Sequence, residues 1–431
     1  MATRAERQAQ LIEMRIALAS QAFNPSGPVP HRDLFAGRES QLTDVLGAVG
    51  QAGQHAILFG ERGVGKTSLA SLTHEFWALM QSDYNICSVR SNCSSTDSYQ
   101  SIWAEIVQLI TDQYEKQGEE LPSGSAWKEL YADISAGEAT THKVRRFLDL
   151  TGKTFIIVID EFDQIEDGYT VQEFSNTIKE LSDFLIPATI ILVGVADTVD
   201  DLIENYSSIE RALRQVRMPA MSTNELVQIV ERGYNVARLK AKPDVLERIG
   251  RMSQGLPHYA HRIGQESGFA ALNREDINVT HDDVEAGVSR AIELTNETIR
   301  ASYAKAITSP QTGNLYRQVI LACAMARDDD LGFFAAADVR RPLSYITKRD
   351  YGIPQFVGHL KKFCTASKGE ILQVEGEDWS RRYRFKTPLM RPYVVLKGIQ
   401  DNFISQDDVM RFEYTENGRS VRPYQATLFG D

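Results

Sequence analysis

The feature that most constrains this chain is a glycine-rich segment, Gly60-Glu61-Arg62-Gly63-Val64-Gly65-Lys66-Thr67. It fits the pattern G-x-x-x-x-G-K-[ST], whose backbone N–H groups cradle phosphate in a tight loop, the P-loop. The apolar run 55–59 before it predicts a buried parallel strand, and the residues from Ser68 onward predict a helix. Strand, glycine-rich turn and helix are the setting that such a loop needs. The sequence therefore predicts a parallel α/β fold organised around a bound phosphate.

Specific roles follow from the chemistry of the loop. Lys66 is expected to reach the β- and γ-phosphates of ATP, and Thr67 to hold Mg²⁺ through its hydroxyl. The alternative is a glycine-rich turn with a chance lysine, which leaves the flanking strand and helix unexplained. The residues expected to bind nucleotide here are Gly60, Glu61, Arg62, Gly63, Val64, Gly65, Lys66, Thr67 and Ser68.

A second segment, Thr154 to Asp163, carries five apolar residues followed by acids. This pattern predicts a buried parallel strand whose carboxylates lie at the sheet edge where α/β folds bind ligands. Asp160 would hold Mg²⁺, and Glu161 would polarise the attacking water as general base. The alternative is a strand that ends in a solvated acidic turn. Paired with the P-loop, the segment predicts hydrolysis of ATP.

Composition limits the class of protein. The chain has 431 residues, enough for two or three domains, and its 42% hydrophobic and 24% charged content is ordinary for globular proteins. It contains no apolar run of about 20 residues, and its charged N-terminus does not read as a secretion signal. The four cysteines are scattered and form no zinc pattern, so we expect a reduced, cytoplasmic compartment.

The segment Leu34-Phe35-Ala36-Gly37-Arg38-Glu39 shortly before the P-loop, together with the Asp-Glu-Phe-Asp box at 160–163, supports a family resemblance. It resembles the AAA+ ATPases of the initiator (origin-recognition-like) clade and the related STAND signalling ATPases. The resemblance implies that this arm covers the adenine, with Arg32, Phe35 and Arg38 shaping the base pocket. Phe35 is equally explained as a core residue, and Arg38 as a surface ion-pair partner.

The resemblance also implies residues that act on the γ-phosphate. Asp197, or Thr198 beside it, stands where sensor 1 aligns the water, although Asp197 is equally explained as the N-cap of a helix over 199–205. Arg211, with Arg214 on the same expected helical face, matches the arginine finger of a neighbouring subunit or of the same chain. A surface salt bridge is the alternative for Arg211.

A later segment, Gly255-Leu256-Pro257-His258, resembles the Gly-x-Pro segment of STAND lids. The resemblance implies that Pro257 packs near the base and that His258 occupies the position of sensor 2. Histidine donates to phosphate only when protonated or in the right tautomer, and a histidine on the helix surface is the alternative.

The expected organisation is an α/β P-loop AAA+ domain with a parallel sheet, followed by an all-α lid and a C-terminal winged helix-turn-helix. The winged helix is predicted from three helical stretches and a hairpin around 371–386. The expected boundaries are 1–30 for an N-terminal helix and arm, 31–221 for the nucleotide-binding domain, 222–308 for the lid, 309–400 for the winged helix and 401–431 for a partly extended or disordered tail.

The winged-helix segment is basic within an acidic chain. Between Arg340 and Lys397 there are thirteen Lys and Arg against five Asp and Glu, whereas the whole chain carries a net charge of −11. Such a face could neutralise the phosphates of duplex DNA or dock onto the acidic ATPase domain. The residues proposed to contact DNA are Arg340, Arg341, Lys361, Lys362, Arg381, Arg382 and Arg384.

Three functions are compatible with these patterns. The first is an ATP-hydrolysing switch whose nucleotide state controls oligomer, partner or DNA engagement. The second is an ATP-regulated DNA-binding protein of the replication-initiator or transposition-regulator kind, with little turnover. The third is a scaffold ATPase in defence or signalling. In each case ATP and Mg²⁺ are the expected ligands, and a homo-oligomer or a partner protein is expected.

Overall fold

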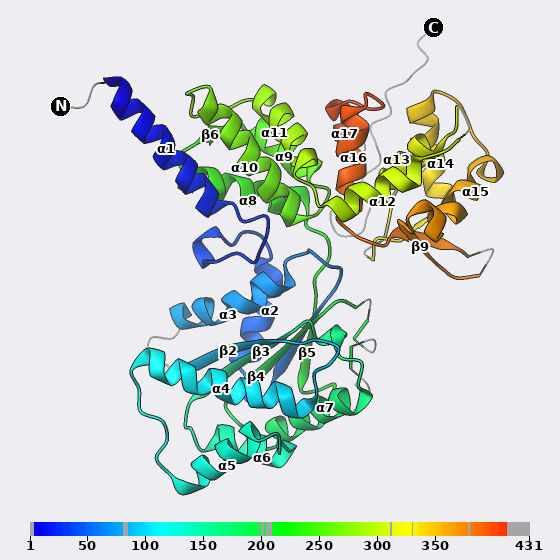
Figure 1. The fold of residues 1–431 in the computed structure, drawn as a ribbon. Coiled ribbons are helices and arrows are strands. Elements are labelled where there is room, and N and C mark those ends of the chain that lie inside the picture. The colour runs from blue at the N-terminus through cyan, green and yellow to red at the C-terminus, as the bar shows by residue number, and fades with distance from the viewer. Residues whose placement is uncertain are drawn as a thin grey trace.

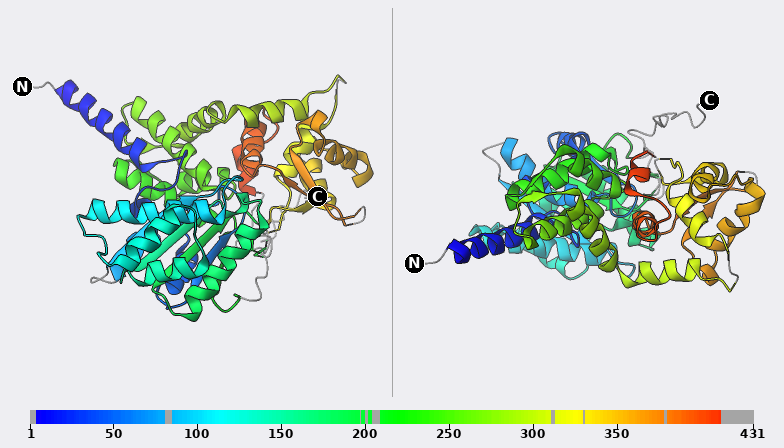
Figure 2. Two further views of the ribbon diagram at one scale, coloured as in Figure 1. Left: turned by 60° about the horizontal axis from the view of Figure 1, so that its bottom comes forward. Right: turned by 90° about the horizontal axis from the view of Figure 1, so that it is seen from above.

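The computed structural model describes residues 4–80, 85–196, 198–199, 202–203, 209–310, 313–329, 331–377 and 380–411. Figure 1 shows an α/β domain below, a helical lid above it, and a C-terminal domain to the right of the lid. Helix α1 (Arg4–Ala22) leaves the lid on the side opposite the C-terminal domain, as the view from above in Figure 2 also shows.

The α/β domain is built on a five-stranded sheet in the order β2-β3-β4-β1-β5, with every neighbouring pair parallel. Alternate residues of β1 enter two apolar cores, Ala56 and Leu58 on one face and Ile57 and Phe59 on the other. The predicted strands at 55–59 and 154–160 are confirmed. The strands are β1 (His55–Phe59), β2 (Ile86–Asn92), β3 (Thr154–Asp160), β4 (Ala188–Gly194) and β5 (Leu213–Arg217).

Helices cover both faces of this sheet, which makes a three-layer sandwich. The core on one face includes side chains of α2 (Glu39–Val49) and α3 (Lys66–Met80). The core on the other face includes side chains of α4 (Tyr99–Gln117), α5 (Ser125–Ser135), α6 (Thr141–Asp149) and α7 (Gly168–Asp183). Because all strands are parallel, their carboxyl ends meet at one edge, where the P-loop joins β1 to α3.

The lid follows β5 and is helical, as expected. It consists of α8 (Thr223–Ala237), α9 (Pro243–Met252), α10 (Pro257–Asn273) and α11 (His281–Glu293), with the short pair β6 (Lys240–Ala241) and β7 (Asn278–Val279). Phe23, just after α1, fills a slot at which Gly233 and Gly264 carry no side chain. Among the helices that the structure describes, none is long and apolar enough to cross a bilayer.

Helix α12 (Glu297–Ile307) leads from the lid into the C-terminal domain, which we define as residues 313–411. The expected helices and hairpin are present. They are α13 (Tyr316–Ala324), α14 (Ala336–Thr347), α15 (Ile353–Phe363) and α16 (Met390–Gln400), with β8 (Phe334–Ala335), β9 (Leu372–Glu375) and β10 (Arg382–Phe385) in one sheet of order β8-β10-β9. Part of the predicted tail is helical, α17 (Gln406–Arg411), and it returns to the lid through an Arg248–Asp407 ion pair of 2.6 Å.

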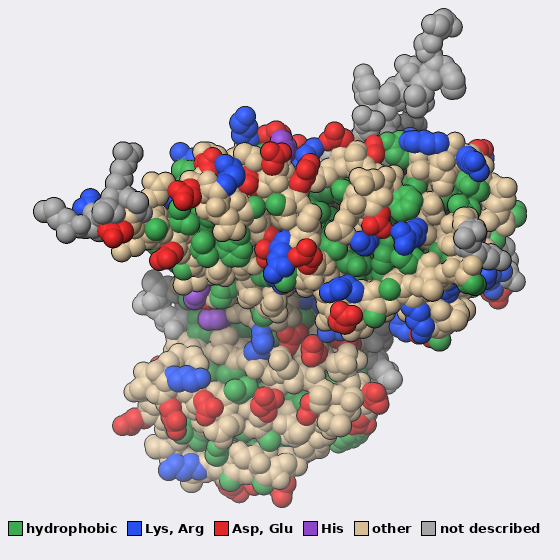
Figure 3. Space-filling model, turned by 45° about the horizontal axis from the view of Figure 1, so that its top comes forward, with side chains coloured by type: hydrophobic (Ala, Val, Ile, Leu, Met, Phe, Trp, Pro, Cys, Tyr) green, Lys and Arg blue, Asp and Glu red, His purple; other side chains and the backbone are tan. Residues whose placement is uncertain are grey.

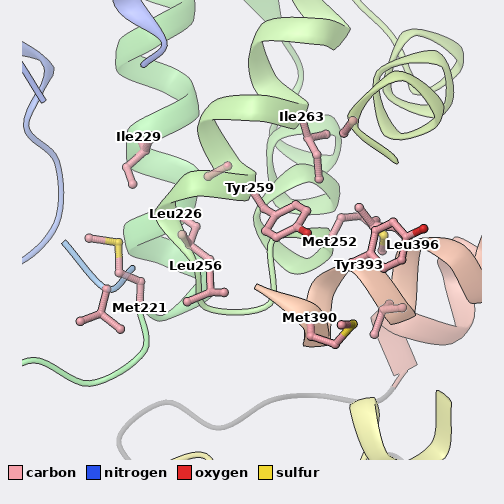
Figure 4. Packing of buried hydrophobic residues seen from close by; sticks show 14 of the residues in the cluster. Met221, Leu226, Ile229, Met252, Leu256, Tyr259, Ile263, Met390, Tyr393 and Leu396 are labelled. Carbon is pink, nitrogen blue, oxygen red and sulfur yellow. The ribbon is translucent and has the colours of Figure 1, made fainter. Parts of the chain in front are cut away.

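The lid and the C-terminal domain share one apolar core. Figure 4 shows Tyr259 and Met252 of the lid facing Met390 and Tyr393 of α16. The hydroxyl of Tyr259 donates to the carbonyl of Leu389 over 2.9 Å, which adds a partly buried polar contact to this packing. Burial of aromatic and methionine side chains on both sides holds the two parts together.

Candidate nucleotide-binding site

The P-loop has the backbone that its glycines permit. Gly63 and Gly65 adopt φ angles of +86° and +97°, which residues with side chains rarely adopt. No atom lies within 4 Å of a Cβ built on either residue, so the space beside them is open to a ligand. Lys66 begins α3, so the loop lies against the amino end of that helix, where backbone N–H groups favour an anion.

Lys66 points into the loop. Its ammonium donates to the carbonyls of Gly60 and Glu61 over 2.8 and 2.7 Å, and only 7% of the residue is exposed. Burial lowers the pKa of Lys66 to about 8, against the opposing effect of the Asp163 and Asp160 carboxylates. The lysine is therefore a buried cation between the loop and the acids that follow β3.

The two acids predicted at the end of β3 diverge in space. Asp160 is 4% exposed, and its Oδ1 accepts from the backbone N–H of Glu161 over 2.9 Å. Glu161 has a left-handed backbone, with φ of +55°, and an exposed side chain. This bend separates a buried carboxylate beside Lys66 from an exposed one that solvent water can approach.

A third acid belongs to this edge, and its role was missed in the sequence. Asp163 Oδ1 accepts from the N–H of Val195 over 2.8 Å, which ties the segment after β3 to the segment after β4. Of the charges that act on Lys66, that of Asp163 has the largest effect on its pKa. The signal was present as the last residue of the Asp-Glu-Phe-Asp box.

The structure corrects the prediction for the arginine finger. Arg211 lies in an exposed turn and Arg214 on β5, so the two do not share a helical face. Arg214 instead pairs with Asp44 of α2 over 3.0 Å. The segment was misread because Leu213 and Val216, three residues apart, fit a helical period although they enter opposite cores of a strand.

The position of Arg211 limits what it can reach. It precedes β5, and the pairing of His55 with Leu213 places it at the amino edge of the sheet, opposite the P-loop. A five-residue strand spans about 16 Å, so Arg211 is too far away to act on its own phosphate site. Asp197, predicted as sensor 1, lies outside the described residues.

The arm before α2 is buried over residues 35–38. Phe35 is 7% exposed and meets Phe76 edge-to-face at 5.6 Å, as expected of a core residue. Arg38 is 2% exposed, and its guanidinium donates to the carbonyl of Val64. This burial contradicts the alternative of a surface ion-pair partner, whereas the role of Arg38 at the base pocket stays a prediction. The backbone N–H of Arg32 donates to the carboxylate of Glu75 over 3.3 Å.

His258 forms a hydrogen bond with the segment that follows α1. Pro257 is the first residue of α10, and His258 Nδ1 lies 2.5 Å from the carbonyl of Pro25. Burial lowers the pKa of His258, which favours the neutral form of the ring. Because a carbonyl only accepts, Nδ1 carries the proton and Nε2 is an acceptor. In this tautomer Nε2 would donate to a phosphate only after protonation, and the role of His258 as sensor 2 stays a prediction.

Comparison with known proteins places this site in a family. The family model described as Novel STAND NTPase 1 matches residues 23–328, which is more than half of the chain. A Walker-type ATPase of Pyrococcus abyssi has a similar fold, with 16% identity and a TM-score of 0.50 over 86% of this chain and 99% of that one. No curated protein matches the sequence significantly.

Two initiator proteins are also similar at the level of the solved structure. The ORC2 protein of Aeropyrum pernix, solved as ADPNP–ADP complexes, has 15% identity and a TM-score of 0.47 over 86% of this chain and 98% of that one. Cdc6p of Pyrobaculum aerophilum has 14% identity and a TM-score of 0.44 over 89% and 99%. The P-loop, the acids after β3 and the match over residues 23–328 agree, and the chain belongs to the Novel STAND NTPase 1 family.

Proposed function

We propose that this protein is a nucleotide-controlled switch. It would bind ATP with Mg²⁺ at the P-loop, hydrolyse it slowly, and position its C-terminal domain according to the nucleotide state. Lys66 would hold the β- and γ-phosphates, and Glu161 would take the proton of the attacking water.

The donor set at the edge suits Mg²⁺. Within the described ranges, no three His, Cys, Asp or Glu side chains gather as a metal-binding group. Mg²⁺ needs no such cage, since one or two protein oxygens and the phosphates of the substrate are its usual ligands. Asp160 and Thr67 would supply those oxygens, and the bound ion would offset charge on the phosphates.

A contact between the C-terminal domain and the P-loop carries the switch proposal. The turn around Gly332, between α13 and β8, lies against Glu61. A Cβ on Gly332 would stand 2.6 Å from Glu61 Oε1. The turn is braced from within, because Asp329 Oδ1 accepts from the N–H groups of Leu331 and Phe333 over 3.0 and 2.9 Å. Because this turn is held rigidly and contacts Glu61, the second residue of the P-loop, a conformational change of the P-loop would move the turn as well.

Nucleotide entry would disturb this contact directly. A P-loop that closes around phosphates fixes Glu61 and its neighbours in one conformation. A ligand shifts the position of the C-terminal domain only if it binds one arrangement more tightly than the other. The contact between the Gly332 turn and Glu61 is where such a difference in nucleotide affinity between the two arrangements can arise.

A substitution of Gly332 by aspartate is expected to release the domain. The added carboxylate would face Glu61, and a repulsion of about 1.4 kcal/mol would speed ADP release about tenfold. Small-angle scattering should show a larger radius, and stopped-flow release of a fluorescent ADP gives the rate. Gly332→Asn is the matched control, because it has the same shape and tolerance of positive φ without the charge. Equal release rates in the two variants would contradict the switch proposal.

A second candidate function is ATP-regulated binding of duplex DNA by the C-terminal domain, which we interpret as a winged helix. Basic side chains gather over this domain on the right of Figure 3, whereas the visible face of the α/β domain carries more acidic ones. Neutralising DNA phosphates requires such a patch of positive charge.

Internal pairs reduce the charge available to DNA. Arg340 pairs with Asp350 over 2.8 Å, and Arg382 pairs with Asp329 over 2.5 Å. Arg341, Lys361 and Lys362 are exposed, the last two in the final turn of α15. The DNA candidate therefore depends chiefly on these three side chains, together with Arg381, which precedes β10, and Arg384 on β10.

Removing the three exposed charges tests this candidate. The triple variant Arg341→Gln, Lys361→Gln, Lys362→Gln is expected to lower the slope of log affinity against log salt by about 2.7. Fluorescence anisotropy with a labelled duplex at several salt concentrations measures the slope. The control removes three exposed lysines of the α/β domain, Lys116, Lys128 and Lys179. If the two triple variants have the same slope, the basic face does not bind DNA.

A further inference from the structure

The carboxylate of Glu225 in the lid accepts hydrogen bonds both within the lid and from the α/β domain. Glu225, in the first turn of α8, closes a capping box, since its Oε2 accepts from the N–H and the hydroxyl of Ser222 over 2.8 and 2.9 Å. Its Oε1 accepts from the backbone N–H of Arg38 over 3.2 Å and lies 3.9 Å from the Arg38 guanidinium. The cap of the lid's first helix is thus also a partner of the segment that opens the α/β domain.

The side chain of Arg38 continues this connection to the phosphate site. It is 1% exposed and donates to the carbonyl of Val64, in the P-loop, over 3.0 Å. It also donates to the carbonyl of Pro219, in the link from β5 to the lid. One buried guanidinium therefore joins the P-loop, the interdomain link and the lid. Burial lowers the pKa of Arg38 to about 10, with Glu225 opposing that shift.

The backbone around Arg38 is clamped by the same helix. Gly37 and Arg38 both have φ of +68°, and a Cβ on Gly37 would stand 2.8 Å from the Cβ of Glu225. The N–H of Gly37 donates to Gln228 over 3.1 Å, and Arg232 donates to the carbonyl of Phe35. Residues of α8 spaced by three and four thus grip the arm from one side, so that α8 cannot shift without moving Arg38.

We propose that Arg38 and Glu225 are positioning residues that couple the orientation of the lid to the conformation of the P-loop. If α8 moves away, Glu225 leaves Arg38, and a buried guanidinium without its carboxylate is strongly unfavourable. Arg38 must then change position and release the carbonyl of Val64. The pair therefore favours two discrete arrangements of the lid and the P-loop over a continuum. This inference rests on the proposed nucleotide site at the P-loop.

A double-mutant cycle on nucleotide affinity tests the coupling. Glu225→Gln keeps the capping box, which glutamine also closes, but removes the charge beside Arg38. Arg38→Lys keeps the positive charge but lacks the planar guanidinium that donates to the carbonyls of both Val64 and Pro219. Each single variant is expected to bind ADP about tenfold more weakly. The double variant should be no weaker than the weaker single variant, because both changes break one connection.

The measurements are ADP titration and thermal unfolding of the full chain. A role in stability alone would lower the unfolding midpoint and leave ADP affinity unchanged, whereas the proposal expects ADP affinity to fall as well, because the loss of the carboxylate beside buried Arg38 also disturbs the P-loop. Glu231→Gln, an exposed position on the same helix, is the matched control and should bind ADP as the unchanged protein does. The coupling would be overturned if the losses of ADP affinity in the two single variants added up in the double variant, or if Glu225→Gln bound ADP with full affinity.

The outcome is separate from that of the switch proposal. The cycle measures equilibrium ADP affinity in variants of Arg38 and Glu225, whereas the switch is tested by the Gly332 variants and by whether nucleotide moves the C-terminal domain in the unchanged protein. Scattering that is identical with and without nucleotide would reject the switch and leave the cycle to decide the coupling. If Arg38→Lys fails to fold, the comparison of Glu225→Gln with Glu231→Gln still decides it.

Discussion

Replacing Glu161 with glutamine is expected to lower the rate of ATP hydrolysis by about 10²–10⁴-fold while ATP still binds. The amide of glutamine cannot take a proton from water. Because Glu161 is exposed at the sheet edge, the substitution leaves the buried residues of the site in place, so ATP should still bind. Phosphate release under single-turnover conditions measures the rate, and equilibrium binding of a fluorescent ATP measures the affinity.

Two further variants make this result specific. Lys66→Ala removes the buried ammonium and should abolish binding itself, which separates loss of substrate from loss of chemistry. Asp163→Asn changes a neighbouring acid that supports the N–H of Val195, so a smaller decrease is expected there. Hydrolysis at the normal rate in Glu161→Gln would show that another group activates the water.

Replacing Arg211 with alanine is expected to lower hydrolysis by about 10³-fold at high protein concentration and to have little effect in dilute solution. Arg211 lies at the sheet edge opposite its own P-loop, so any action on phosphate must occur in a neighbouring subunit. Activity of the unchanged protein should therefore rise steeply with concentration, and the variant should lose that rise. Steady-state phosphate release over a concentration series is the measurement.

A mixing experiment distinguishes action between subunits from a structural defect. Arg211→Ala and Lys66→Ala should each be inactive alone, but a mixture should regain activity because an intact Arg211 can then meet an intact P-loop. Arg214→Ala is the control for charge loss, since Arg214 pairs with Asp44 and should have little effect on turnover. A mixture without activity would contradict a finger in trans.

The sequence predicted the parts of this site that have local causes. The apolar residues 56–59 specify β1, and glycines that tolerate positive φ specify the P-loop, without help from distant residues. The strand β3 with its acids follows the same rule. The Arg211 segment was misassigned because it is short and its apolar spacing fits more than one period. The local preference of these residues for helix or strand could not decide the assignment, whereas the pairing of β5 with β1 makes the segment a strand.

Other features depend on contacts between distant parts of the chain. Arg38 is buried only because Glu225, Val64 and Pro219 close around it, and a local pattern describes it equally well as a surface residue. The approach of Gly332 to Glu61 brings together two segments that are far apart in the sequence. The tautomer of His258 is likewise set by the carbonyl of Pro25, more than two hundred residues earlier.

The shared core around Tyr259 and Met390 has a mechanical consequence. Because apolar packing and the Arg248–Asp407 pair connect the lid to the C-terminal domain, we expect the two to move together as one rigid unit. The expected pivot is the link between β5 and α8, which contains Pro219, and α15 lies in the C-terminal domain at the far side of the lid (Figure 1). A small rotation at the pivot becomes a much larger sweep at α15, so a sub-ångström adjustment beside the phosphates would carry the basic face over a distance that a partner molecule can register.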